Sequence, residues 1–267
     1  MFNKRNFKRQ FRSVPTVRRR HLFIEQLECR RLLATILWDG GGNGTAWSDA
    51  ANWDTNSLPT SADDVIINVA SNPAISVTGI VTVNSLITHE SITFGSGTFT
   101  SLSVQLNAAG TISSASIVGA NFNGTGTLQI TSVDGTLNQV TLGLNTTLRT
   151  GAQVTVLGGL TLAGGSRLLL EQNSNCDNSS TIDVGLNFAG GVQLLGGSGV
   201  VELYNAAGTT GCGHYSPPVP QEDDVRVRPT GAGTLTIGSG VTVRNTTNST
   251  LTTLGDATTG TGGALVN

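Results

Sequence analysis

The chain has 267 residues, of which 37% are hydrophobic and 12% charged, against about 45–50% and about 25% in typical soluble domains. Its net charge of −2 combines a basic start, with ten of the 15 basic and two of the 17 acidic residues before position 32, and an acidic remainder that has five arginines and no lysine. This distribution argues against a nucleic-acid-binding body, and no run approaches the roughly 18 apolar residues of a transmembrane helix.

The first 37 residues are expected to form a basic leader. Residues 1–31 carry a net charge of +8, and all 35 glycines of the chain lie at or after Gly40. A polybasic arm can bind nucleic acid or anionic lipid, but the acidic body favours export as its role. We expect residues 1–37 to be a disordered or helical export leader that ends near Ala34.

Within this leader, the segment FIEQLECRRLLA at residues 23–34 resembles the Leu-Glu-Pro-Arg-x-Leu-Leu motif found at the start of many large bacterial surface proteins. The export-motif positions are Leu27, Glu28, Cys29, Arg30, Leu32 and Leu33. Cys29 replaces the proline, which would fix the backbone angle there. The resemblance implies export or sorting, and periodicity alone allows an amphipathic helix instead.

Residues 38–68 are expected to form a tryptophan-rich N-terminal cap. The three tryptophans of the chain are Trp38, Trp47 and Trp53. This segment resembles the opening unit of autotransporter-type surface proteins, which often begin with Trp-Asp-Gly and then an Asn-Trp pair. Large rings gathered at one place suit the covering of the end of a stack. The alternative is that the three indoles contact a glycan.

A calcium site is a further alternative within the cap. Its oxygen ligands would be Asp39, Asn43, Asp49 and Asp54. The segment lacks the ligand spacing of known calcium loops. We therefore expect no metal site.

Residues 69–267 show the alternation of apolar and small polar residues that is typical of strands. Turn-forming phrases such as NGTG, LGG and GSG separate the strands. Leu102, Leu128 and Val154 share a local pattern and follow one another at intervals of 26 residues, which indicates a solenoid. The predicted fold is all-β, a right-handed parallel β-helix of eight or nine coils, and an irregular β-sandwich is the alternative.

Two polar insertions interrupt the body, near residues 171–180 and 206–230. They are expected to protrude as loops, and they are the first place to look for a recognition surface. Cys176 lies in one insertion and Cys212 in the other. In an oxidising compartment the two can form a disulfide, and otherwise they are two free thiols.

The residue chemistry does not favour catalysis. Parallel β-helices include polysaccharide lyases and glycosidases, so the fold itself excludes nothing. The five arginines of the body are scattered, and the adjacent carboxylates of Asp63–Asp64 and Asp223–Asp224 would point to opposite faces of a strand. We expect no catalytic site and no cofactor.

These features together predict an exported structural or adhesive scaffold, located at the cell surface or outside the cell. Its expected partners are cell-surface polysaccharide or other envelope proteins, with no nucleic acid and no transmembrane segment. The alternative is a carbohydrate-binding module or a polysaccharide-active β-helix enzyme.

Overall fold

The computed structural model describes residues 34–173, 183–206, 225–246, 252–255 and 264–266. The chain falls into two units, Met1–Arg31 and Leu32–Asn267, and the described residues all belong to the second. The predicted export motif, the Cys176–Cys212 pair and Asp223–Asp224 lie outside the described residues.

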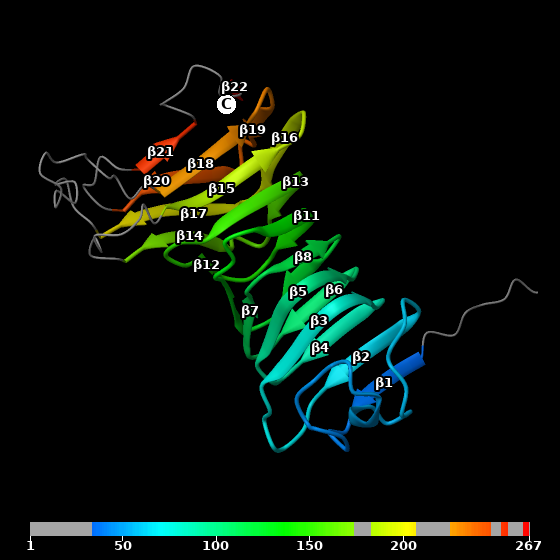
Figure 1. Ribbon diagram of the computed structural model, residues 1–267. Coiled ribbons are helices and arrows are strands. Elements are labelled where there is room, and N and C mark those ends of the chain that lie inside the picture. The colour runs from blue at the N-terminus through cyan, green and yellow to red at the C-terminus, as the bar shows by residue number, and fades with distance from the viewer. Residues whose placement is uncertain (1–33, 174–182, 207–224, 247–251, 256–263, 267) are drawn as a thin grey trace, which may run out of the picture. The chain divides into compact units, whose positions relative to one another are not determined.

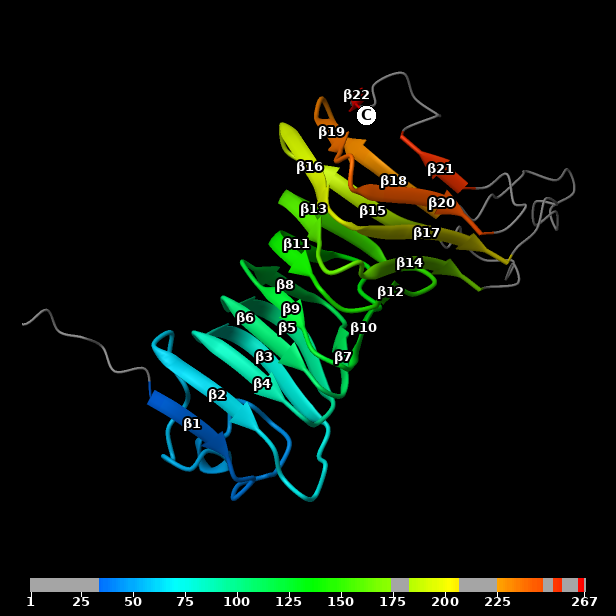
Figure 2. The same cartoon turned by 180° about the vertical axis from the view of Figure 1, so that it is seen from behind.

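The second unit is a parallel β-helix, so the predicted fold class is confirmed. Its described residues form 22 strands in one sheet, with a single short 3-10 helix, η1 (Ala50–Asn52). The strand pairings are all parallel. Figures 1 and 2 show the strands following one another along the stack from β1 to β22.

The strands stack in three columns, which the chain visits in turn. Column A consists of β1 (Ala34–Trp38), β2 (Asp63–Ile67), β4 (Ser85–Thr88), β6 (Ser103–Leu106), β9 (Asn121–Asn123), the second halves of β11 (Gly135–Leu142) and β13 (Gln153–Leu162), β16 (Val192–Gly197), β19 (Thr234–Ile237) and β22 (Ala264–Val266). Faces A, B and C below are the outward surfaces of the three columns.

Columns B and C complete each coil. Column B consists of the first halves of β3 (Ile75–Thr82) and β5 (Ile92–Thr100), then β7 (Ala109–Ile112), β10 (Thr127–Ile130), β12 (Thr146–Leu148), β14 (Arg167–Gln172), β17 (Gly199–Asn205) and β20 (Val241–Asn245). Column C consists of the second halves of β3 and β5, β8 (Ala115–Val118), the first halves of β11 and β13, β15 (Val184–Ala189), β18 (Val225–Thr230) and β21 (Thr252–Leu254).

The length of a coil differs from the predicted interval of 26 residues. Ile75 pairs with Ile92, 17 positions later, and Leu148 pairs with Leu170, 22 positions later. Leu102 is 71% exposed, whereas Leu128 lies in column B and Val154 in column C. The predicted period is therefore wrong, because an interval of 26 residues joins similar strands from different sides of the stack rather than stacked positions.

The core follows from the alternation of side chains in the strands. In column A the inner residues Val65, Leu86, Val104 and Phe122 stack on one another and are fully buried. Similar inner rows run along the other two columns and merge into one apolar cluster. Outward positions carry short polar residues, which suit a pleated surface in contact with water.

Four predicted boundaries differ from the structure. β1 begins at Ala34, so part of the expected leader is a strand, and β2 lies within the expected cap. The insertions are narrower than predicted, since Glu171 and Gln172 end β14, and β18 starts at Val225. β18, with the sequence VRVRPT, was not predicted as a strand, because it contains a proline and its outward positions carry arginines in place of small polar residues.

Candidate functional site

The three cap tryptophans are buried. Trp38 is 3%, Trp47 2% and Trp53 0% exposed. The ring of Trp53 meets the edges or faces of the other two at centroid distances of 4.8 and 4.7 Å, and its Nε1 donates to the carbonyl oxygen of Trp47 at 3.0 Å. A glycan platform needs exposed ring faces, so the interpretation of these tryptophans as glycan contacts is wrong for this conformation.

An aromatic series connects the cap to the first coils. Trp47 packs edge-to-face on Phe99, with ring centroids 6.3 Å apart, and Phe99 packs on Phe94 at 4.7 Å. Phe94 in turn lies 6.2 Å from Phe122. Ser76 of β3 also forms a parallel bridge with Ala46 of the cap. The cap is thus part of the hydrophobic core and covers the start of column B.

The polar residues of the cap satisfy its own backbone. Asn52 is fully buried, and its Oδ1 accepts from the amides of Gly42 and Gly44 at 3.0 and 2.8 Å. Asp49 Oδ2 accepts from the amide of Asn43 at 2.9 Å. Asp49, one of the candidate calcium ligands, and Asn52 thus hold the glycine-rich turn. The described residues contain no group of three metal-ligating side chains.

Asp63 and Asp64 have separate structural partners. Asp63 Oδ2 accepts from the backbone amide and the hydroxyl of Thr60 at 2.7 and 2.8 Å. Asp64 Oδ1 accepts from Ser85 Oγ and Asn84 Nδ2, and these hydrogen bonds lower the pKa of Asp64 from its ordinary value. Asp63 thus holds the local turn before β2, and Asp64 ties β2 to the start of the next coil.

Three consecutive coils open at the same corner, between columns B and C. The chain leaves the described part after β14, after β17 and after β20, and it returns at Asp183, at Val225 and at Thr252. Gln172 is the partner of Asn205, and Val184 is the partner of Val225. Both predicted insertions therefore begin on adjacent strands and end on adjacent strands. Repeat proteins often bind through insertions gathered on one side.

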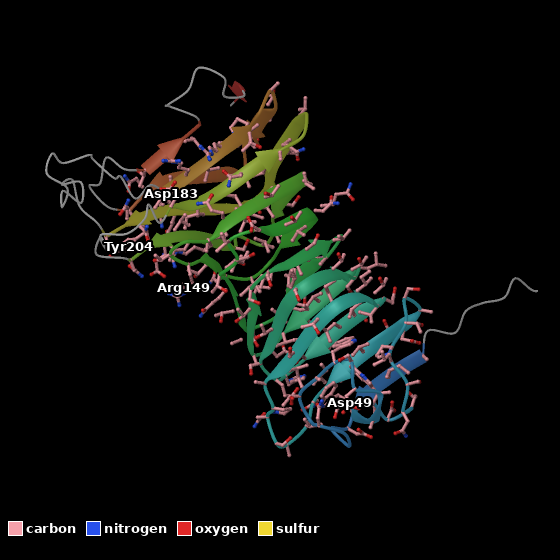
Figure 3. The ribbon with its side chains drawn as sticks, viewed as in Figure 1. Asp49, Arg149, Asp183 and Tyr204 are labelled. Carbon is pink, nitrogen blue, oxygen red and sulfur yellow. The ribbon has the colours of Figure 1, made fainter. Side chains whose placement is uncertain are left out.

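Ion pairs lie beside this corner. Arg149 pairs with Glu171 at 2.5 Å, and Arg226 with Asp183 at 3.2 Å. Figure 3 shows Arg149, Asp183 and Tyr204 on the same side of the stack, and Asp49 in the cap. Each pair joins consecutive coils and so fixes their register where the chain leaves the stack.

A buried ionic triad crosses three coils on face B. Glu202 of β17 pairs with Arg167 of β14 and Arg244 of β20. The Glu202 side chain is 4% exposed, whereas the two arginines are about half exposed. Burial acts to raise the pKa of Glu202, but the hydrogen bonds and charges of Arg244 and Arg167 outweigh it, so the pKa is lowered.

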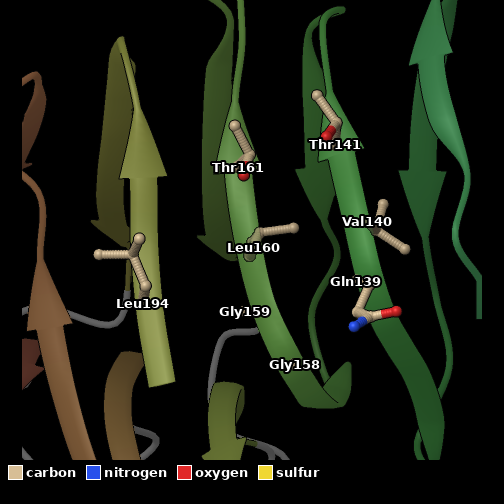
Figure 4. A pocket seen from close by; sticks show the side chains of 8 residues that line it. All are labelled: Gln139, Val140, Thr141, Gly158, Gly159, Leu160, Thr161 and Leu194. Atoms are coloured by element: carbon tan, nitrogen blue, oxygen red, sulfur yellow. The ribbon is translucent and has the colours of Figure 1, made fainter. Parts of the chain in front are cut away.

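A hollow of about 260 Å³ lies on face A, where β11 and β13 bend from column C into column A. Figure 4 shows Gly158 and Gly159 between Gln139 on β11 and Leu194 on β16. Thr141 and Thr161 supply hydroxyl groups along the same lining. This feature was not predicted from the sequence, where the LGG phrase at residues 157–159 indicates only a turn. That Gly158 and Gly159 of β13 lie opposite Gln139 of β11 at a β-bulge is known only from the register of these two strands.

Within the described residues, no helix is long and apolar enough to span a membrane. Among the described residues, the candidate features are the hollow on face A, the corner between columns B and C, and the ionic triad of Glu202. No protein-family profile, curated protein or solved structure matches the chain.

Proposed function

We propose that the chain is an exported, non-catalytic scaffold at a bacterial cell surface, where it acts as a spacer or presents an adhesive surface. The observation that carries this proposal is the single apolar cluster, which extends from Ile36 in the first strand to Ile237 in β19. A core of this kind keeps successive coils in register and holds the outer faces at fixed spacing.

The resemblance of residues 23–34 to a motif of bacterial surface proteins supports export. The position of β1 adds a constraint, because its partner β2 needs residues 34–38 in place. We therefore expect processing to remove the basic leader by a cut at or before the bond between Leu33 and Ala34. The partners of the scaffold would be cell-surface polysaccharide or other envelope proteins.

Expression of the full chain with a C-terminal epitope tests this proposal. Intact cells are treated with protease and with an antibody against the epitope, and a cytoplasmic marker protein serves as the control for lysis. We expect the epitope to be accessible on intact cells and lost after protease treatment. An epitope that is protected until the cells are broken would contradict surface exposure. Mass spectrometry of the mature N-terminus locates the processing site.

A matched variant tests the motif. Replacing Leu32 and Leu33 by serine changes the motif but neither the charge of the leader nor any described strand. We expect this variant to stay inside the cell, whereas Leu22→Ser, outside the motif, is exported. Equal export of the two variants would remove the motif from the proposal.

A further inference from the structure

The hollow on face A is a built feature rather than a gap between coils. Gln193 is 7% exposed, and its Oε1 accepts from the amide of Gly159 at 2.8 Å. Its Nε2 donates to the carbonyl oxygens of Ala189, at 2.9 Å, and of Gly190. The buried Gln193 side chain thus connects Gly159, at the floor of the hollow, to the turn that precedes β16 in the next coil. A site held by such supporting hydrogen bonds needs little reorganisation when a ligand binds.

The wall residue Gln139 has an unusual backbone. Its φ is 55°, and the other described non-glycine residues with positive φ are Asn56 and Asn72. Asparagine tolerates this region, whereas glutamine does so less readily. Gly158 and Gly159, on the next coil, have φ values of 64° and 89°. Glycine would fit position 139 without strain, which makes the Gln139 side chain a candidate for a role beyond folding.

The lining chemistry is neutral and mixed. The Gln139 amide and the hydroxyls of Thr141 and Thr161 can donate and accept hydrogen bonds. Leu194, which is 50% exposed, offers an aliphatic surface. Val140 and Leu160 point into the core and contribute only backbone. None of the eight described residues that line the hollow is charged, so these side chains offer no counter-charge to an acidic or basic ligand.

From these observations we propose that the hollow between Gln139 and Leu194 binds one sugar unit of a neutral polysaccharide. An amide and two hydroxyls match adjacent sugar hydroxyls, and the leucine packs against the carbon-hydrogen face of the ring. The volume of about 260 Å³ lies below the 300–1,000 Å³ of sites for drug-sized ligands, as suits a single ring. The hollow is on an outer face, so a polymer can continue on both sides.

This inference deepens the proposed function, on which its biological meaning rests, by naming a ligand class for the adhesive surface. Binding is measured with the purified full chain, independently of where the chain is located in the cell. Affinity gel electrophoresis is run with a neutral glucan, mannan, galactan or xylan in the gel. Dextran and dextran sulfate, which share a backbone, compare neutral with charged polymer. We expect retardation by at least one neutral polymer. Dextran sulfate can retard the chain only through the basic residues 1–31, so we expect Gln139→Gly to leave that retardation unchanged.

Two variants and a matched control test the site. Gln139→Gly removes the amide and relieves the backbone, so we expect unchanged or raised thermal stability and at least about a tenfold loss of affinity. Thr141→Val is expected to weaken binding about fivefold, as one lost hydrogen bond does. Thr136→Val makes the same change in the same strand but on face C, and it should bind like the unmodified chain.

Three results would overturn the proposal. They are the absence of retardation by every neutral polymer, unchanged binding by Gln139→Gly, and equal losses in Thr141→Val and Thr136→Val. None of these results bears on surface exposure, so a failure of the binding site and a failure of the proposed location are distinguishable.

Discussion

Gly97 shows how closely neighbouring coils approach at a single residue. It pairs with Gly79 of the coil below, and a Cβ added at Gly97 would lie 2.0 Å from the carbonyl oxygen of Gly79. Its φ of 124° is also unfavourable for a residue with a side chain. Gly79 itself has a φ of 81° but open space around its added Cβ.

These two glycines make a matched pair of predictions. Gly79→Ala is expected to cost about 1–2 kcal/mol, because only the backbone conformation is unfavourable. Gly97→Ala is expected to cost about 3 kcal/mol or more, because the coils must also separate. Urea unfolding of both variants measures the difference, and equal losses would show that the close approach does not constrain this corner.

Trp53 is the central residue of the cap. Its ring contacts both other tryptophans and is fully buried. We expect Trp53→Ala to lower the free energy of unfolding by about 3–5 kcal/mol, as for other buried aromatic residues. Leu102→Ala, at a residue that is 71% exposed, should change it by no more than about 0.5 kcal/mol. A Trp53→Ala variant as stable as Leu102→Ala would show that the cap does not stabilise the stack.

At the scale of elements, the triad of Glu202 links β14, β17 and β20. Because the folded state lowers the pKa of Glu202 below its ordinary value of 4.5, the ionised form stabilises the fold above that pH. This contribution is lost as the pH falls through the lowered pKa. We expect the free energy of unfolding to decrease on acidification below about pH 4.5, and Glu202→Gln to flatten this part of the pH profile.

Glu171→Gln is the comparison for this prediction. Glu171 has a single arginine partner, and its side chain is 18% exposed rather than 4%. At pH 7 we expect Glu202→Gln to cost about 1.5–3 kcal/mol and Glu171→Gln no more than about 1 kcal/mol. Chemical unfolding at pH 7 and pH 4 provides both values. A reversed order would contradict the assignment of the triad as the stronger link.

The common corner of the insertions makes the predicted disulfide testable. Cys176 follows Gln172 by four positions and Cys212 follows Asn205 by seven, and these two anchors are partners in adjacent strands. Under oxidising conditions we expect a peptide cross-linked through Cys176 and Cys212 in a non-reducing digest. Cys176→Ser should release one thiol that reacts with a maleimide. Three reactive thiols in the unmodified full chain under oxidising conditions, that of Cys29 included, would mean that the bond does not form.

The strands were predictable from sequence, whereas the coil length was not. Ile75–Thr82 and Gly135–Leu142 lie in the segment 69–267, whose alternation predicted strands, and both form strands with buried inner positions. Each coil contains three similar short strands, so sequence similarity alone does not say which strand lies above which. The burial of Trp47 could not be predicted from the sequence either, because an indole can equally well cover the end of a stack or bind a sugar.

The candidate hollow was beyond sequence analysis for a related reason. Gln139 and Leu194 are 55 positions apart, and only the stacking of β11, β13 and β16 brings them to the same face. Glycine pairs occur at many turns of this chain. At Gly158 and Gly159, the role of the glycine pair depends on the side chains that the neighbouring coils place beside it.

At the scale of the whole stack, one complete coil should be removable. Leu128 is the partner of Gly110, 18 positions earlier, so deletion of residues 110–127 places β10 on β5 with its inner row unchanged. We expect this variant to keep a strand-type circular dichroism spectrum and a cooperative, somewhat lowered melting transition. Deletion of residues 110–118 shifts the inner row by an odd number and turns apolar residues outward. If both deletions unfold, the coils are not independent units.

The direction of the backbone hydrogen bonds has a mechanical consequence. From β3 to β21 these bonds connect one coil to the next in all three columns, so tension along this part of the stack is shared by three ladders at each level. A force applied to a loop at one corner instead breaks the hydrogen bonds of a single coil one after another. A tether fixed at the two ends would therefore withstand much greater force than one gripped at its side, and this difference suits a spacer under drag.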